Sequence, residues 1–255
     1  MVSRTASLPT FAGLALPPAT AAAPRFALGL AAVDARLGGG LAVAALHELY
    51  AQSDSDAASV AAFALLLAQR CGRPGPILWL REDRAARHDR PYGLGMVDLG
   101  LDPARLVLVQ APDTLALLRA GAEAMACAAL AAVLIEPYGR AVAFDLTVSR
   151  RFMLSAARSG VLGLALRGGD PVPSAAQSRW HIAAAPSSAL AADAPGAPAF
   201  TVTLLRHRSG IAGFATRMEW DRDSASFTAP RSGAVPAAAP LRTAAAPATS
   251  RRRAA

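Results

Sequence analysis

Short, uniformly apolar segments alternate with longer apolar segments through the middle of this 255-residue sequence. The short segments are rich in Leu, Val and Ile, which predicts buried β-strands. The longer segments have the length and flanking residues of helices. The predicted strands are 45–50, 77–80, 105–109, 132–135 and 161–166, and the predicted helices are 57–70, a short helix within 91–100, 113–128 and 145–159. Strands joined by helices predict a mostly parallel sheet that is covered on both faces.

After residue 177 the pattern changes, because strand-like segments follow one another without a helix between them. Segments 179–183, 199–206 and 213–220 alternate apolar and polar residues, and Ser209-Gly210 predicts the last turn. We expect these segments to form an antiparallel extension. The predicted fold class is therefore α/β, with a mostly parallel central sheet flanked by helices and a C-terminal antiparallel extension.

The two ends of the chain differ in composition from the middle. Residues 1–24 are rich in Ala, Pro and Thr, and residues 224–255 have the same character, which predicts a disordered leader and a disordered basic tail. The expected domain spans 25–223. Arg4 and Ala21-Ala22-Ala23 resemble parts of a signal peptide, but prolines interrupt the apolar run. We expect a cytoplasmic protein without a cleaved leader or a membrane span.

The 26 basic residues are all arginines, and the formal net charge is +8. The absence of lysine excludes any function that needs an ammonium group. No acidic residue follows Asp223, whereas Arg251, Arg252 and Arg253 lie at the end of the chain. Such a basic tail either contacts an acidic partner such as DNA through salt-sensitive interactions or is simply solvated.

The loop that follows the first of these strands is where an α/β domain usually binds phosphate. Such a loop needs glycines to curl its N–H groups around the anion, and a lysine to reach the terminal phosphates. Here the loop consists of Ala51, Gln52, Ser53, Asp54, Ser55, Asp56, Ala57 and Ala58. It has neither residue type, and its two aspartates repel a phosphate at this place. We predict no tight ATP binding, no cofactor and no enzyme activity; the histidines and cysteines also lack metal-ligand spacing.

Several segments resemble RecA-like proteins and occur in the same order. Residues 26–41 resemble the segment before the RecA phosphate loop, and residues 100–113 resemble the strand that ends in Gln-Pro-Asp. Residues 133–136 occupy the place of the Walker B strand, with Glu136 where aspartate is usual. This resemblance implies a RecA-like arrangement of the sheet and helices.

The C-terminal segments 178–182, 204–210 and 218–221 resemble the ending of the ImuA group. That group comprises RecA-like, SulA-related proteins encoded in bacterial DNA-damage mutagenesis cassettes. The resemblance implies a non-catalytic role in SOS-induced, error-prone translesion synthesis. It also implies three protein partners: the Y-family-like protein ImuB, RecA, and an alternative polymerase III α subunit.

The resemblance gives several charged residues candidate roles. Glu136 either held magnesium or now pairs with a nearby arginine, and Asp83 lies near the position of a catalytic carboxylate but is expected to be solvated. Arg167 stands where RecA-like ATPases carry a glutamine that senses the γ-phosphate, just before a loop that faces DNA in RecA. The candidate contacts to DNA or a protein partner are Arg140, Arg150, Arg151, Arg167, Arg251, Arg252 and Arg253. A solvated helix face is the alternative for Arg150 and Arg151.

Two further functions stay open at this point. A SulA-like inhibitor of cell division would bind FtsZ with the same fold and would also need no ATP. A RecA-like ATPase would require the loop at 51–58 to bind nucleotide in spite of its composition.

Overall fold

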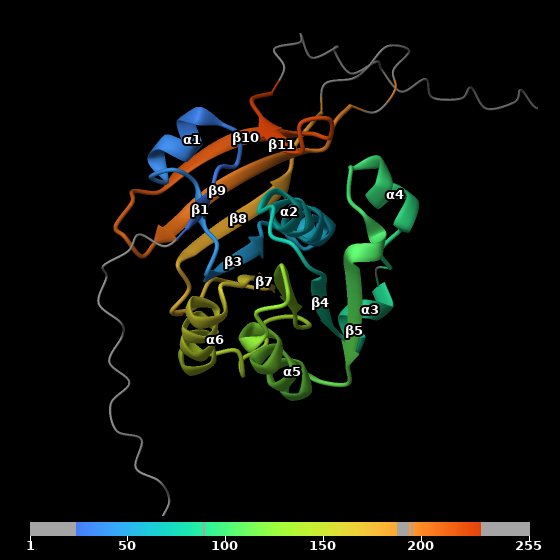
Figure 1. Ribbon diagram of the computed structural model, residues 1–255, viewed down its shortest axis with the longest axis vertical. Helices are drawn as coiled ribbons and strands as arrows, with labels where there is room; N and C mark the ends of the chain where they lie inside the picture. The colour runs from blue at the N-terminus through green and yellow to red at the C-terminus, as the bar shows by residue number, and fades with distance from the viewer. Residues whose placement is uncertain (1–23, 89, 188–193, 195, 231–255) are drawn as a thin grey trace, which may run out of the picture.

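The computed structural model describes residues 24–88, 90–187, 194 and 196–230. The strands are β1 (Arg25–Phe26), β2 (Leu41–Ala42), β3 (Ala45–Ala51), β4 (Ile77–Glu82), β5 (Leu106–Ala111), β6 (Ala132–Glu136), β7 (Leu162–Arg167), β8 (Ser178–Ala184), β9 (Ala199–His207), β10 (Phe214–Asp221) and β11 (Ser226–Thr228). The helices are α1 (Ala31–Arg36), α2 (Ala57–Arg70), α3 (Asp83–His88), α4 (Gly93–Asp98), α5 (Thr114–Ala126) and α6 (Leu146–Ser159), with short 3-10 helices η1 (Asp54–Asp56) and η2 (Pro103–Arg105). In this part of the chain, one large sheet has the strand order β11-β10-β9-β8-β3-β7-β6-β4-β5 (Figure 1).

Strands β8, β3, β7, β6, β4 and β5 run parallel to one another, whereas β9, β10 and β11 continue the sheet as antiparallel strands. This topology confirms the predicted α/β fold with an antiparallel C-terminal extension. The predicted start of that extension was wrong, because β8 pairs in parallel with β3. Residues 168–177 carry the chain from β7 to β8 on the other side of β3 without a helix.

Helices cover both faces of the sheet, with α2 on one face and α5 and α6 on the other (Figure 1). Alternate residues of one strand therefore enter different cores. In β6, Leu134 packs with the cluster that includes α2, and Val133 packs with the cluster that includes α5 and α6. Strand β5 is an exception to the predicted coverage, because it is an outer strand in which Val107 is 43% exposed and Leu108 is 48% exposed.

The described residues extend the sheet beyond the expected domain end at residue 223. Phe227 of β11 is fully buried, and its ring contacts those of Phe63, Phe200 and Trp220. Its backbone N–H donates to the Leu28 carbonyl at 2.9 Å. Residues 1–23 and 231–255, which hold most of the predicted leader and tail, lie outside the described residues. None of the helices described combines the length and apolar character needed to cross a membrane.

The contact between β11 and the start of the domain requires a glycine. Gly29 has a φ of +118°, and a Cβ atom at this position would lie 2.5 Å from the Phe227 carbonyl oxygen. Only glycine combines this backbone conformation with such a close approach. The segment before α1 and strand β11 therefore hold each other in place.

We predict that Phe227→Ala lowers the free energy of unfolding by about 3–5 kcal/mol, because the substitution removes a fully buried aromatic ring. Urea unfolding followed by far-UV circular dichroism measures this change. Val142→Ala is the control, since Val142 is 83% exposed. A loss below about 1 kcal/mol for Phe227→Ala would contradict the assignment of β11 to the core.

Candidate functional site

A cavity of about 680 Å³ lies at the C-terminal ends of the central parallel strands. Ligands of open α/β sheets bind at this edge, because the loops that follow the strands converge there. The cavity is lined by residues that follow or end β3, β6 and β7, together with parts of α2, α3 and β8. The lining residues are Ala51, Gln52, Ser53, Asp54, Ala57, Val60, Ala85, Glu136, Pro137, Tyr138, Gly139, Leu166, Arg167, Gly168, Gly169, Asp170 and His181.

The loop at 51–58 forms one side of this cavity, and its polar groups bond to one another. Ser53 is the N-cap of η1, and its backbone N–H and its hydroxyl both donate to the Asp56 carboxylate, at 3.1 and 2.6 Å. The Gln52 N–H donates to the Ile182 carbonyl at 3.1 Å, and the Asp56 N–H donates to the Ser53 carbonyl at 2.9 Å. Three N–H groups that a phosphate cradle would use are thus already bonded within the chain.

The two aspartates of this loop have different surroundings. Asp56 is buried, and its second oxygen accepts a hydrogen bond from the Ala184 N–H at 2.8 Å, which ties the loop to the end of β8. The Ser53 hydroxyl first, and then the Ala184 N–H, hold the pKa of Asp56 below its ordinary value of 3.8. The expected repulsion of a phosphate by these aspartates stays a prediction. Asp54 lines the cavity, whereas Asp56 serves the loop itself.

Glu136, for which the resemblance implied a Walker B-like position, is held by an arginine and a tryptophan. Arg81 donates to both oxygens of Glu136, from Nε at 2.6 Å and from Nη2 at 3.1 Å. The Trp79 Nε1–H donates to the same carboxylate at 2.8 Å. This two-pronged geometry is the one that arginine favours with carboxylates, so Arg81 is the arginine partner that the sequence analysis expected. Asp83 begins α3 directly after β4.

Another carboxylate, that of Glu48, lies fully buried in β3 and was not predicted from the sequence. Glu48 is fully buried, with Nη1 of Arg167 3.2 Å from one of its oxygens and Nε of Arg179 3.1 Å from the other. The Ser174 hydroxyl donates to Glu48 at 2.6 Å, and the Arg179 guanidinium also contacts Ser174 and the Val172 carbonyl. The available signal was a glutamate within a mostly apolar strand, because a buried charge needs a partner.

The structure accounts differently for each candidate arginine. Arg167 is buried, pairs with Glu48 and lies over the Phe144 ring at 4.3 Å, so the expected role in contacting DNA or a partner is not available to it in this structure. Arg140 is exposed in the turn after β6, and Arg150 and Arg151 are exposed on α6. Arg251, Arg252 and Arg253 lie outside the described residues.

Acidic side chains therefore line this cavity and its arginine is already paired, and both features disfavour the binding of a triphosphate. Asp54, Asp170 and Glu136 line it, and the one arginine among the lining residues is engaged with Glu48. Within the described residues, no group of three His, Cys, Asp or Glu side chains is arranged to hold a metal ion. The Ser53 hydroxyl, where a phosphate-binding loop would hold magnesium, instead bonds to Asp56 and Ser55.

The fold and this cavity define a mixed α/β protein whose loop after β3 lacks the features of a phosphate-binding loop. No family model matches the chain. The chain is similar to Protein ImuA of Caulobacter vibrioides, in strain NA1000 / CB15N and in strain CB 15, with 33% identity over 192 residues in both cases. The match covers 69% of this chain and 75% of each relative. The chain therefore belongs to the ImuA family.

We predict that Asp56→Asn destabilises the protein by about 1–3 kcal/mol near neutral pH, because the loop loses its charged acceptor. The pKa of Asp56 is lowered in the folded state, so its contribution is present above the ordinary value of 3.8 and is lost as the pH falls through the lower folded value. The stability difference between wild type and variant should shrink below about pH 4. Urea unfolding at several pH values tests this, with the exposed Asp54→Asn as control.

Glu48→Gln should cost about 3–5 kcal/mol, because the substitution leaves the buried Arg167 and the half-buried Arg179 without their counter-charge. Thermal and urea unfolding measure the loss. Glu123→Gln on the exposed side of α5 removes the same charge and should change stability by less than about 0.5 kcal/mol. Equal effects of the two substitutions would show that the Glu48 cluster does not stabilise the fold.

Proposed function

We propose that this protein is a non-catalytic accessory protein of DNA-damage-induced, error-prone translesion synthesis. It acts by binding protein partners and not by hydrolysing ATP. The partners are a Y-family-like protein of the ImuB type, RecA, and an alternative polymerase III α subunit. The observation that carries the proposal is the loop after β3, whose N–H and hydroxyl groups bond to Asp56 and to neighbouring carbonyls.

The energetics at this loop oppose nucleotide binding. One carboxylate about 4 Å from a phosphate charge costs about 4 kcal/mol at an effective dielectric constant of 20, and Asp54 lines the cavity at this place. The dipole of a helix N-terminus favours an anion by only about 0.3–1 kcal/mol. No lysine exists in the sequence to offset the difference. The composition of the loop after β3 thus supports a role in binding partners in preference to a role as an ATPase.

Membership in the ImuA family supports the association with DNA-damage mutagenesis. The particular partners follow from the resemblance of the C-terminal strands to that family and from the RecA-like order of segments. A folded domain without a phosphate-binding loop would contribute to a multiprotein complex by binding partners through its surface, and not by catalysis.

We predict that the protein shows no saturable binding of ATP with magnesium up to about 1 mM, which corresponds to a binding free energy weaker than about −4 kcal/mol. Isothermal titration calorimetry of the full chain measures this. A phosphate-loop ATPase titrated with the same nucleotide stock serves as the positive control. Micromolar affinity would contradict the proposal.

We also expect the tagged chain, expressed from its own locus after DNA damage, to recover the Y-family-like protein or RecA. A strain that lacks the gene should show fewer damage-induced mutations and unchanged cell length. Recovery of neither partner, or filamentation on overexpression with no change in mutation frequency, would instead favour a division inhibitor of the SulA type.

A further inference from the structure

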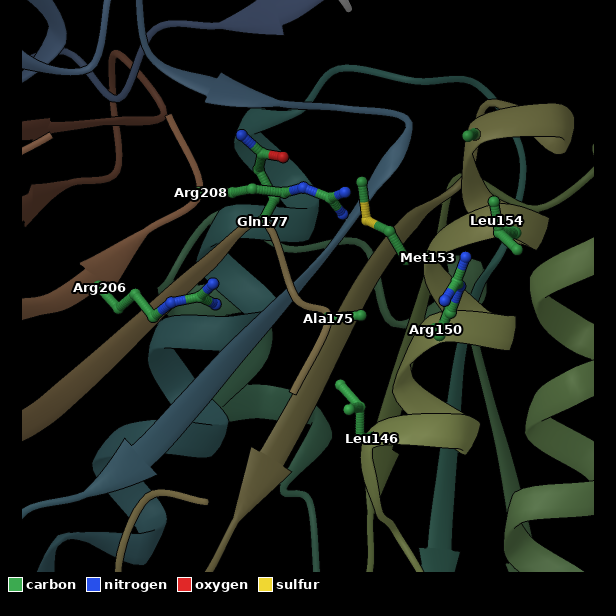
Figure 2. A pocket seen from close by; sticks show the side chains of 9 residues that line it. Leu146, Arg150, Met153, Leu154, Ala175, Gln177, Arg206 and Arg208 are labelled. Carbon is green, nitrogen blue, oxygen red and sulfur yellow. The ribbon is translucent and has the colours of Figure 1, made fainter. Parts of the chain in front are cut away.

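A second hollow, which we call the α6 groove, lies between α6, the segment that leads into β8, and the end of β9 (Figure 2). Its volume is about 450 Å³, and it shares no lining residue with the cavity at the ends of the parallel strands. The lining residues are Leu146, Arg150, Met153, Leu154, Ala157, Ala175, Gln177, Arg206 and Arg208.

Helix α6 supplies one wall of the groove with a face that the fold buries only in part, because Met153 and Leu154 are half-buried and Met153 packs against the core. Ser149, Phe152 and Ala156 form its buried face. The residues that line the groove recur at helical spacing along a different stripe, and they are Leu146, Arg150, Met153, Leu154 and Ala157. Leu146 is 53% exposed. An amphipathic helix normally buries a single stripe, so α6 has a second, mostly apolar stripe that no described element covers completely.

Arginines border this apolar floor from two sides. Arg206 and Arg208 extend from the end of β9 toward α6, and Arg150 rises from α6 itself (Figure 2). All three are exposed, and within the described residues none of them forms an ion pair. Arg206 donates one hydrogen bond, to the Ser174 carbonyl at 3.4 Å. No carboxylate lines the groove, so its charge is uncompensated within the described part of the fold.

We propose that the α6 groove binds an acidic, amphipathic segment of a partner protein. Such a segment places apolar side chains on the floor formed by Leu146, Met153 and Leu154. Its carboxylates then meet the guanidinium groups at the border, where bidentate pairing is strong. The proposal rests on the proposed function for the identity of the partner, because that function requires a protein-binding surface.

Charge and lining chemistry separate this occupant from two others. Single-stranded nucleic acid stacks its bases on aromatic side chains, and no aromatic residue lines the groove. The chain's own ends do not match its charge either, because residues 1–23 and 231–255 contain no Asp or Glu. A partner that brings both carboxylates and apolar side chains fits the lining best.

The test uses fluorescence anisotropy with the full chain and a labelled probe peptide of about 18 residues, five helical turns, with leucine and glutamate at helical spacing. We expect saturable binding that Arg150→Glu together with Arg206→Glu weakens at least about tenfold. Arg84→Glu together with Arg87→Glu is the matched control, because it makes the same charge change at exposed positions of α3 and should leave the affinity within about twofold. Leu146→Ser should weaken binding without any change in charge.

Unchanged peptide affinity in the α6 variants would overturn the proposal. Equal binding of a peptide with lysine in place of glutamate would also overturn it. So would a loss of oligo-dT binding in the α6 variants at unchanged peptide affinity, because nucleic acid would then be the occupant of the groove. Size-exclusion chromatography at several concentrations tests whether a second copy of the chain fills the groove. A dimer that the α6 variants abolish would show this and would overturn the proposal. Recovery of partner proteins by the wild-type chain tests the proposed function separately. The proposed function and the proposal for the α6 groove can therefore fail independently of each other.

Discussion

The carboxylate of Asp56 is the contact on which the shape of the loop after β3 depends. It accepts hydrogen bonds from the hydroxyl and N–H of Ser53 and from the N–H of Ala184, and so joins the start of α2 to the end of β8. A phosphate-binding loop presents the same kinds of donor outward to a ligand. Here an internal acid takes the place of the anion. These donors of the loop are therefore satisfied by groups of the chain itself.

Two other acidic residues of the central strands, Glu48 and Glu136, are also satisfied within the chain. Glu48 meets Arg167 and Arg179, and Glu136 meets Arg81. Arginine suits these sites because its planar guanidinium donates several hydrogen bonds in a fixed geometry and keeps its charge when buried. Buried ion pairs contribute little net stability, yet they are costly to break. The pairs therefore join β4 to β6, and β3 to both β7 and β8.

Apolar runs were sufficient to predict the five parallel strands from β3 to β7 and the helices α2, α5 and α6. The parallel pairing of β8 with β3 was not predictable, because alternation within 179–183 says nothing about which neighbour a strand will have. Three residues of β11 are too few to give a periodic signal. At the site, the loop composition identified the missing phosphate cradle, whereas the direction of Asp56 depends on Ala184, 128 residues away. The partners of Glu48 are similarly distant, at 119 and 131 residues.

Strand β5 lies at the end of the sheet and pairs with no described strand other than β4. From Leu106 to Ala111 it carries no charged residue, no proline and no bulge. Natural proteins usually protect an outer strand with one of these features, because an open row of backbone donors and acceptors recruits other extended chains. We therefore expect concentrated preparations of the isolated protein to aggregate edge to edge, and a charged side chain in place of the half-exposed Leu108 to oppose this.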